Sequence, residues 1–243
     1  MSKKLYTSGE INAVFNSDIN KNLFFNKVEI DSRQLSNRII FFAIKGVNDD
    51  GHRYVRAVLK NKNNLAIISE KPNNLRSIRT INTLEGLRNL ASYARQRSNS
   101  KIIAITGSCG KTSLKNLLNS SLSRFGKTHC SPKSFNNHYG VPYSLANLSS
   151  DNKYGVFELG MSFKGEIDKL VNLVKPHIAI ITNIGPAHLE NFKNINGICK
   201  AKAEIMNGIC QNGIIILNKD DKFFYSLKKI ADHKNIKVLT FGY

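Results

Sequence analysis

Cysteine is scarce in this chain, and the spacing of the few cysteines matches no metal-binding or redox motif. There are four, Cys109, Cys130, Cys199 and Cys210, with no CxxC pair and no Cys/His cluster at zinc-ligand spacing. The sequence therefore indicates neither a disulfide framework nor a structural metal, and we expect reduced thiols.

Long apolar runs are also lacking. No uninterrupted stretch is long enough to span a bilayer, and the first fifteen residues lack the apolar segment and small-residue cleavage site of a secretory signal. No internal repeat or low-complexity linker occurs. These absences predict a cytoplasmic protein without membrane insertion.

Acidic residues are few, 17 against 36 lysines and arginines, which gives a formal charge of +19. Such a field attracts anions of many kinds, including nucleic acid, an acidic membrane or a nucleotide-bearing substrate. The basic residues are spread along the chain, aromatic residues are not interleaved with them, and no zinc-finger or RNA-recognition signature is present. Nucleic acid is the weaker alternative.

With 243 residues and 41% hydrophobic residues, the chain can bury one large core or two modest ones. Its texture changes near residues 78–84, which predicts two domains, 1–80 and 81–243. Short strand-like runs at 38–44 and 65–69 stand among Asn/Asp/Gly turns, which indicates a small mixed α/β module.

The second region alternates apolar runs with helical patterns. The runs at 102–105, 155–159, 177–182, 213–217 and 238–241 are typical of strands, and most of them indicate burial on both faces. Helix-compatible stretches occur at 84–97, 111–125, 165–174 and 195–210. This alternation predicts an α/β fold with a mostly parallel sheet and helices on both sides.

The strongest motif is a glycine-rich turn between the strand at 102–105 and the following helix. It consists of Thr106, Gly107, Ser108, Cys109, Gly110, Lys111, Thr112 and Ser113. A strand, glycine turn, Lys-Thr pair and helix place backbone N–H groups around phosphate oxygens. Lys111 is expected to reach the β- and γ-phosphates of ATP, and the Thr112 hydroxyl to bind Mg²⁺. Ile105 stands where the longer GxxxxGK[ST] pattern has glycine, so the match is to the shorter GxxGKT form.

Further polar residues follow other predicted strands, at the edge where ligands of parallel sheets bind. Glu158 ends one strand and is a candidate Mg²⁺ ligand. His188 follows another and contacts metal or phosphate, or is structural. Asn136 and Asn137 recognise a ligand or stabilise turns, and the isolated pattern favours turns. Lys202 by itself is more typical of a solvated helix face.

Together these segments resemble the Mur ligase family. The resemblance rests on residues 31–33, 42–46 and 50–52, on the loop at 106–113, on 135–142, on 158–161 and 165–167, and on 182–184, 187–188 and 201–205. These motifs occur in family order across nearly the whole chain. Residues 135–142 and the serine after Thr112 favour the branch that uses D-alanyl-D-alanine.

The resemblance implies an ATP-dependent amide ligase of peptidoglycan synthesis. The carboxylate of UDP-N-acetylmuramoyl-tripeptide would be phosphorylated by ATP, and D-alanyl-D-alanine would attack the acyl phosphate. The catalytic residues implied are Lys111, Glu158, His188 and Lys202, with Thr112, Glu158, His188 and carbamylated Lys202 holding Mg²⁺. The residues implied in substrate binding are Ser32, Arg33, Gly46, Asp50, His52, Asn136 and Asn137.

Family members continue into the rest of the ATPase domain and a third domain that closes over the site. The resemblance therefore implies a chain that lacks its C-terminal part, or one half of a split enzyme, whose activity alone is in doubt. The alternatives are a sister ligase, such as the enzyme that adds the third peptide residue or folylpolyglutamate synthase, and a non-catalytic nucleotide- or nucleic-acid-binding module.

Overall fold

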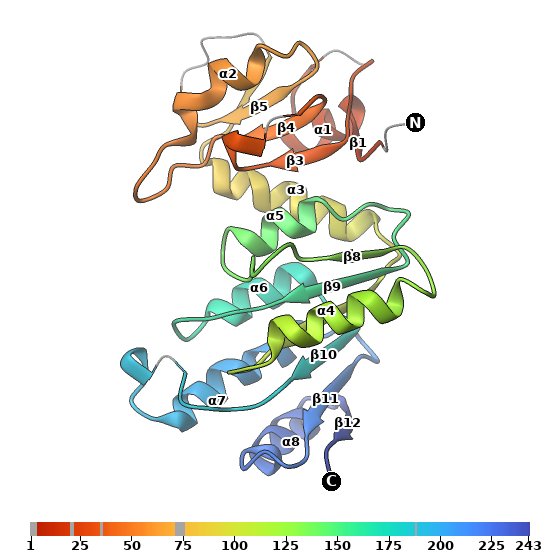
Figure 1. Cartoon of the computed structure of the whole chain (residues 1–243), viewed down its shortest axis with the longest axis vertical. Helices are drawn as coiled ribbons and strands as arrows, with labels where there is room; N and C mark the ends of the chain where they lie inside the picture. The colour runs from red at the N-terminus through yellow and green to blue at the C-terminus, as the bar shows by residue number, and fades with distance from the viewer. Residues whose placement is uncertain (1–3, 20–21, 35, 71–75, 188) are drawn as a thin grey trace. The chain divides into compact units, whose positions relative to one another are not determined.

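The computed structural model describes residues 4–19, 22–34, 36–70, 76–187 and 189–243. Its contacts divide the chain into two units, Met1–Gln96 and Arg97–Tyr243 (Figure 1). Within the described ranges, no helix has the length and apolar character needed to cross a membrane.

The N-terminal unit is built on a four-stranded parallel sheet in the order β3-β4-β5-β6. Its strands are β3 (Lys27–Glu29), β4 (Ile39–Phe42), β5 (Leu65–Ile68) and β6 (Ser77–Arg79), and β1 (Tyr6–Thr7) pairs antiparallel with β2 (Phe24–Phe25). Its helices are α1 (Ser8–Phe15), α2 (Val55–Leu59) and α3 (Thr83–Arg97), with 3₁₀ turns at Ser32–Gln34 and Gly51–Tyr54. Strand β4 is fully buried, as its unbroken Ile-Ile-Phe-Phe run predicts.

Helix α3 belongs to the N-terminal unit, although the change in sequence texture precedes it. Gly86 of α3 lies against Phe15 of α1 and Ile67 of β5. The Tyr93 hydroxyl of α3 donates to the Glu10 carboxylate of α1 at 3.3 Å. Contacts therefore divide the chain after Gln96, whereas composition indicated a boundary at residue 80.

The C-terminal unit contains a six-stranded sheet in the order β12-β11-β10-β7-β9-β8, and every pairing is parallel. The strands are β7 (Lys101–Thr106), β8 (Thr128–Cys130), β9 (Tyr154–Glu158), β10 (Ile178–Ile181), β11 (Ile214–Asn218) and β12 (Lys237–Phe241). The helices are α4 (Lys111–Leu122), α5 (Gly140–Ala146), α6 (Glu166–Val174), α7 (Ile195–Ala203) and α8 (Phe224–His233), with 3₁₀ turns at Leu189–Asn191 and Glu204–Gly208. The predicted α/β class with a largely parallel sheet is confirmed.

Helix α4 covers one face of this sheet and α6 packs behind it (Figure 1). Leu114, Leu118 and Leu122 of α4 contact the buried side chains of Ile103, Ile105, Val156 and Ile180. Central β7 lies between β9 and β10, so the loops that follow these three strands meet at one edge.

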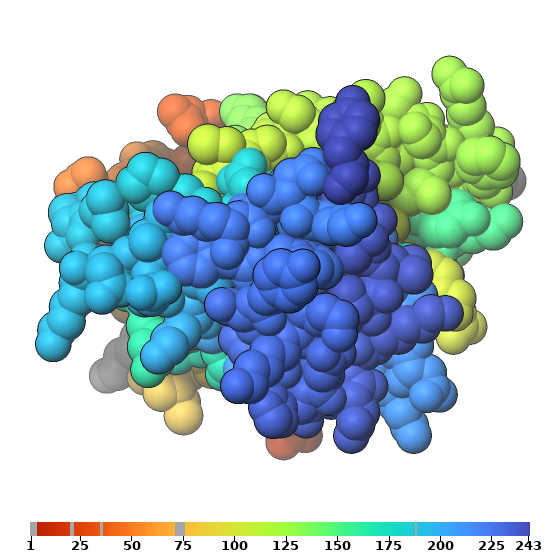
Figure 2. All heavy atoms as spheres, turned by 90° about the horizontal axis from the view of Figure 1, so that it is seen from below, coloured from red at the N-terminus to blue at the C-terminus, as the bar shows by residue number. Residues whose placement is uncertain are grey.

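Two expectations for this unit needed correction. The helix predicted over 195–210 ends at Ala203 and tightens into a 3₁₀ turn that reaches Gly208, a residue with low helix propensity. The run at 213–217 is not buried on both faces, because β11 alternates buried and half-buried residues. The strand predicted at 238–241 forms the edge strand β12, which is largely exposed (Figure 2).

Candidate functional site

The glycine-rich loop leaves β7 through a backbone that only glycine can occupy. Gly107 has φ +150°, and a Cβ at this position would lie 1.8 Å from Thr182 Oγ1. Gly110 has φ +81° and is the N-cap of α4, where no side chain of the described residues closes the helix end. The first N–H groups of α4 therefore remain available to an anion.

The segment after β10 clamps this loop. Thr182 Oγ1 donates to the carbonyl of Cys109 at 2.6 Å, and the Asn183 side-chain oxygen accepts from Cys109 N–H at 2.9 Å. Ser108 Oγ donates to the carbonyl of Gly185 at 3.0 Å and accepts from Gly185 N–H at 2.8 Å. These bonds join residues more than 70 positions apart and fix the loop before any ligand binds.

Lys111 folds back over the loop that precedes it. Its Nζ donates to the carbonyls of Gly107 at 2.7 Å and Ser108 at 3.3 Å. The ammonium group therefore lies over the loop that the motif predicts to bind phosphate. An anion bound there would replace two neutral carbonyl partners with a charged one, and such hydrogen bonds are about twice as strong.

A buried carboxylate lies beside the start of α4. Glu158, at the end of β9, is 1% exposed. Its Oε2 accepts from Thr112 Oγ1 at 2.9 Å, and its Oε1 accepts from the Asn136 side-chain amide at 2.8 Å. The structure thus brings three predicted site residues together from α4, β9 and the loop before α5.

Lys115 is a residue of this cluster that sequence reasoning missed. It is 1% exposed, and its Nζ lies 3.7 Å from Glu158 Oε2 and donates to the carbonyl of Lys133. A signal was present in the sequence, because Lys115 falls in the apolar stripe formed by Leu114, Leu118 and Leu122. A lysine in such a stripe needs a buried partner.

Lys202 in α7 is also buried, with 3% of its surface exposed. Burial, followed by repulsion from the Lys111 charge, lowers the pKa of Lys202 to about 8. The expectation of a solvated lysine from the isolated pattern is therefore wrong. With this pKa, about half of the Lys202 side chains are neutral amines near pH 8, and a neutral amine is a nucleophile.

The remaining predicted residues of the C-terminal unit have local roles or fall outside the description. The Asn137 side chain accepts from Gly140 N–H at 2.9 Å and Tyr139 N–H at 3.2 Å, so it supports the turn that enters α5. Ser113 is an exposed residue of α4. His188 lies outside the described residues. Thr106 Oγ1 is buried and, among the described residues, has no hydrogen-bond partner.

The predicted substrate residues of the N-terminal unit gather near the carboxyl ends of its strands. Ser32 and the exposed Arg33 lie in the 3₁₀ turn after β3, where Arg33 pairs with Asp31 at 2.9 Å. Gly46, after β4, donates its N–H to the carbonyl of Asp49 at 2.8 Å. Asp50 and His52 begin the next 3₁₀ turn. Parallel sheets bind ligands at this edge.

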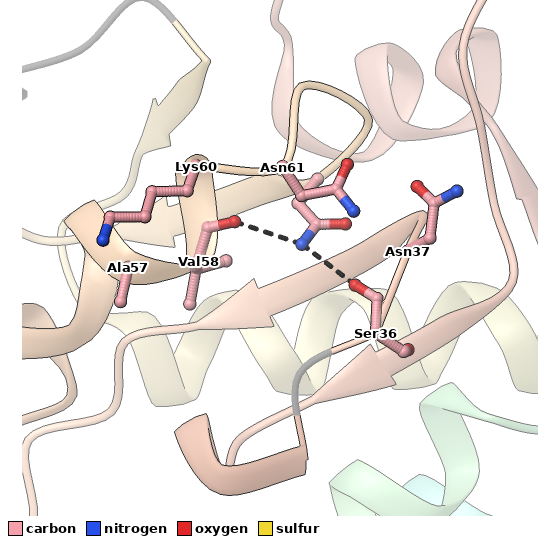
Figure 3. A pocket seen from close by; sticks show the side chains of 7 residues that line it. Ser36, Asn37, Ala57, Val58, Lys60 and Asn61 are labelled. Carbon is pink, nitrogen blue, oxygen red and sulfur yellow. Dashed lines mark hydrogen bonds between the residues drawn. The ribbon is translucent and has the colours of Figure 1, made fainter.

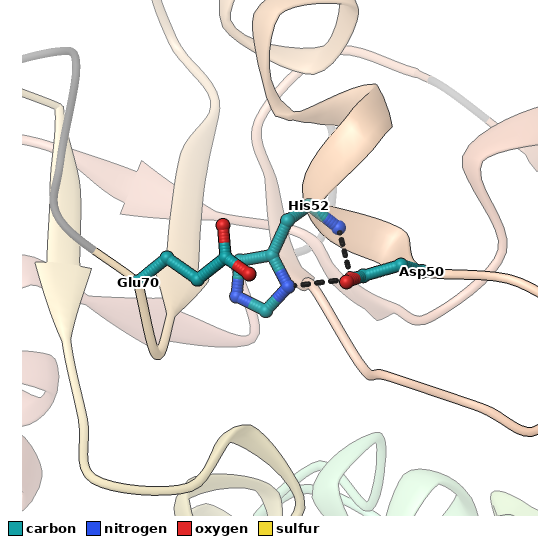
Figure 4. Close-up of side chains that lie close together, drawn as sticks. All are labelled: Asp50, His52 and Glu70. Carbon is teal, nitrogen blue, oxygen red and sulfur yellow. Dashed lines mark hydrogen bonds and ion pairs between the residues drawn. The ribbon is translucent and has the colours of Figure 1, made fainter.

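Asp50, His52 and Glu70 form a cluster with ligand atoms within 4.8 Å of one another (Figure 4). His52 Nε2 accepts from Ser69 N–H at 3.0 Å, so the ring proton is on Nδ1, which lies 2.6 Å from Asp50 Oδ1. Hydrogen bonding from the His52 backbone N–H holds the pKa of Asp50 below its usual value. Because both ring nitrogens of His52 are engaged, the cluster offers no imidazole lone pair to a metal.

A pocket of about 330 Å³ opens at the opposite, amino-terminal edge of the same sheet (Figure 3). Asn64, just before β5, donates to the carbonyls of Ser36 and Val58, both at 3.1 Å, and accepts from Ile39 N–H at 3.1 Å. The buried Asn64 side chain in the pocket wall therefore hydrogen-bonds to other parts of the fold. We assign no ligand to the pocket.

The parallel α/β sheet has a glycine-rich loop after its central strand, a basic side chain over the loop and a buried acid beside it. This arrangement is typical of phosphate-loop proteins. Comparison with known proteins is more specific. The Mur ligase middle domain profile matches residues 105–243. The chain belongs to the Mur ligase family.

Relatives named UDP-N-acetylmuramoyl-tripeptide–D-alanyl-D-alanine ligase and solved structures named MurF are among the proteins that it matches. UDP-N-acetylmuramoyl-tripeptide–D-alanyl-D-alanine ligase of Buchnera aphidicola subsp. Acyrthosiphon pisum is 38% identical over 224 residues, 90% of this chain and 48% of the relative. MurF from Acinetobacter baumannii matches with a TM-score of 0.88 and 33% identity, over 100% of this chain and 54% of that one. MurF ligase from Thermotoga maritima, solved in complex with ADP, matches with a TM-score of 0.77 and 28% identity, over 89% and 50%. The chain spans about half the length of the curated relatives it matches.

Proposed function

We propose that this chain supplies the nucleotide-binding and UDP-sugar-binding parts of a ligase that joins D-alanyl-D-alanine to UDP-N-acetylmuramoyl-tripeptide. The observation that carries the proposal is the convergence of a clamped phosphate loop, Lys111, Lys202 and the Thr112–Glu158 pair at one edge of the sheet. A carboxylate becomes an acyl donor once it is phosphorylated. Transfer of phosphoryl between anions requires positive charge, which Lys111 and Mg²⁺ would provide.

The donor set fits Mg²⁺. The Thr112 hydroxyl and the Glu158 carboxylate are hard oxygen donors in contact with each other, and Asn136 fixes one carboxylate oxygen in place. Mg²⁺ would neutralise phosphate charge while the first turn of α4 and Lys111 hold the phosphate oxygens. His188 and a modified Lys202 are the further ligands that we propose.

Lys202 has the environment that carbamylation needs. Its neutral amine would attack CO₂, form an N–C bond, release one proton and become an anionic carbamate. This product replaces a cation with a carboxylate-like oxygen ligand beside Lys111. Incubation with ¹³C-bicarbonate should give a carbamate carbon signal that is absent from Lys202→Met.

The N-terminal unit is proposed to hold the UDP-sugar peptide through Ser32, Arg33, Gly46, Asp50 and His52. The Arg33 guanidinium is exposed, so it can exchange Asp31 for a phosphate. A cytoplasmic location is part of the same proposal, since ATP and a nucleotide-linked precursor are the expected substrates.

Calorimetry of Mg-ATP binding to the wild-type chain and to Lys111→Ala tests the nucleotide site. We expect binding by the wild type and a loss of at least tenfold in affinity for the variant, because its phosphate contact is charge-assisted. Phosphate release with the tripeptide substrate and D-alanyl-D-alanine then tests the reaction, and other amino acceptors test for a sister ligase. Salt-sensitive nucleic-acid binding without ATP affinity would overturn the proposal.

A further inference from the structure

Lys115 is a buried cation for which the phosphate-loop motif provides no role. It lies one helical turn after Lys111 on α4, and its side chain is 2% exposed, as is that of Glu158. Desolvating two charges costs several kcal/mol for each ion unless they compensate each other. The groups that surround this pair are Thr112, Cys130, the Lys133 carbonyl and Asn136.

Lys115 is placed so that it can compensate the charge of Glu158 without forming a hydrogen bond to it. Lys115 Nζ is 3.7 Å from Glu158 Oε2, within ion-pair range but beyond hydrogen-bond range, and it donates instead to the carbonyl of Lys133. Direct hydrogen bonds to Glu158 come from Thr112 at 2.9 Å and Asn136 at 2.8 Å. An ionised carboxylate offers about four lone-pair sites, so sites remain open to a cation.

We propose that Lys115 is the internal counter-ion of the metal site. In the metal-free protein it balances the charge of the buried Glu158 carboxylate at 3.7 Å and leaves the carboxylate oxygens free of a hydrogen bond from Lys115. A bound divalent cation would balance the Glu158 charge in place of Lys115 and would itself be repelled by Lys115. This repulsion makes the metal affinity lower than the oxygen donors alone would give. This inference rests on the proposed function, because it takes Glu158 as a ligand of the ATP-bound cation.

Lys115→Met keeps the length of the side chain and removes its charge. In metal-free buffer we expect its melting temperature to fall by roughly 6 to 20 °C, since an unpaired buried carboxylate is left. Lys115→Met/Glu158→Gln removes both charges and should recover at least half of that loss. Lys228→Met, which breaks the exposed pair with Asp232 at 2.7 Å, is the matched control and should shift the melting temperature by less than about 2 °C.

The free Mg²⁺ concentration that half-saturates ATP binding distinguishes a counter-ion from a structural lysine. Lys115→Met should need at least about fivefold less Mg²⁺ than the wild type, because a positive charge that repels the cation has been removed. Lys115→Arg retains the charge and should keep the wild-type requirement.

The possible results separate the role of Lys115 from the proposed function. An unchanged or higher Mg²⁺ requirement in Lys115→Met, with normal Mg-ATP binding by the wild type, overturns the role of Lys115 alone. A double variant no more stable than Lys115→Met also overturns it. Absence of Mg-ATP binding by the wild-type chain overturns the proposed function itself.

Discussion

Among individual residues, the buried lysines most clearly separate what the sequence predicts from what the fold decides. Lys111 is identified by its motif, whereas Lys115 and Lys202 look like ordinary helix lysines. Lys115 is buried beside Glu158 at the end of β9, and the buried Lys202 is close enough to Lys111 to be affected by its charge. In both cases the two residues are far apart in the sequence. Helical spacing alone therefore predicted a solvated Lys202, and only tertiary packing gives it a lowered pKa.

The shifted pKa of Lys202 predicts a pH dependence of stability. Its pKa is about 8 in the folded chain and 10.5 as the ordinary value, so between these pH values the unfolded chain binds more protons. Stability should therefore rise from pH 8 to pH 10.5, and the penalty, about 3 kcal/mol, should be fully present below pH 8. Urea unfolding in CO₂-free buffer measures this rise.

Lys202→Met is the reference for that measurement, because other groups also titrate in this range. The wild-type curve minus the variant curve should rise with pH over this window. A flat difference would mean that Lys202 is solvated or charged in the folded protein.

Among the secondary-structure elements, most of those with an apolar run or a long apolar period were predicted, although α8 was missed despite Phe224, Leu227 and Ala231 at helical spacing. The runs that form β4, β5, β7, β9 and β10 and the helices α3, α4 and α6 were predicted close to their bounds. Strands β1, β2, β3 and β6 have only two or three residues, too few to show a period. The clamp that Thr182 and Asn183 place on the loop was also missed, because strand order decides which segments become neighbours.

This clamp predicts how the phosphate loop tolerates substitution. Thr182→Val removes the hydroxyl that donates to the Cys109 carbonyl at 2.6 Å and keeps the side-chain volume. We expect Mg-ATP affinity to fall by roughly two- to tenfold, since one hydrogen bond contributes about 0.5–1.5 kcal/mol. Calorimetry measures the change.

Gly107→Ala is the more severe companion variant, because its Cβ would lie 1.8 Å from Thr182 Oγ1. It should abolish detectable binding while far-UV circular dichroism stays native. Wild-type affinity in Gly107→Ala would mean that the loop is not held by the segment after β10.

At the scale of the whole molecule, the net positive charge is the property that the sequence motifs do not explain. The chain carries +19, whereas the phosphate site accounts for only a few of its cations. Both proposed nucleotide ligands are anions, and a positive field increases the rate at which an anion arrives more than it increases the strength of each contact. Nucleic acid would instead neutralise many cations at once and show a steep salt dependence.

The last prediction concerns this long-range field. Lys229, Lys234 and Lys237 are exposed at α8 and β12, and changing all three to Gln lowers the net charge from +19 to +16, one unit each. Stopped-flow association of Mg-ATP should slow by roughly twofold at 10 mM salt and be unchanged at 0.5 M, where the Debye length falls to a few ångströms. Dissociation should stay constant because none of the three belongs to the proposed site. Equal association rates at low salt would show that the excess charge does not steer the nucleotide, and a slower rate that persists at 0.5 M salt would point to a change in structure.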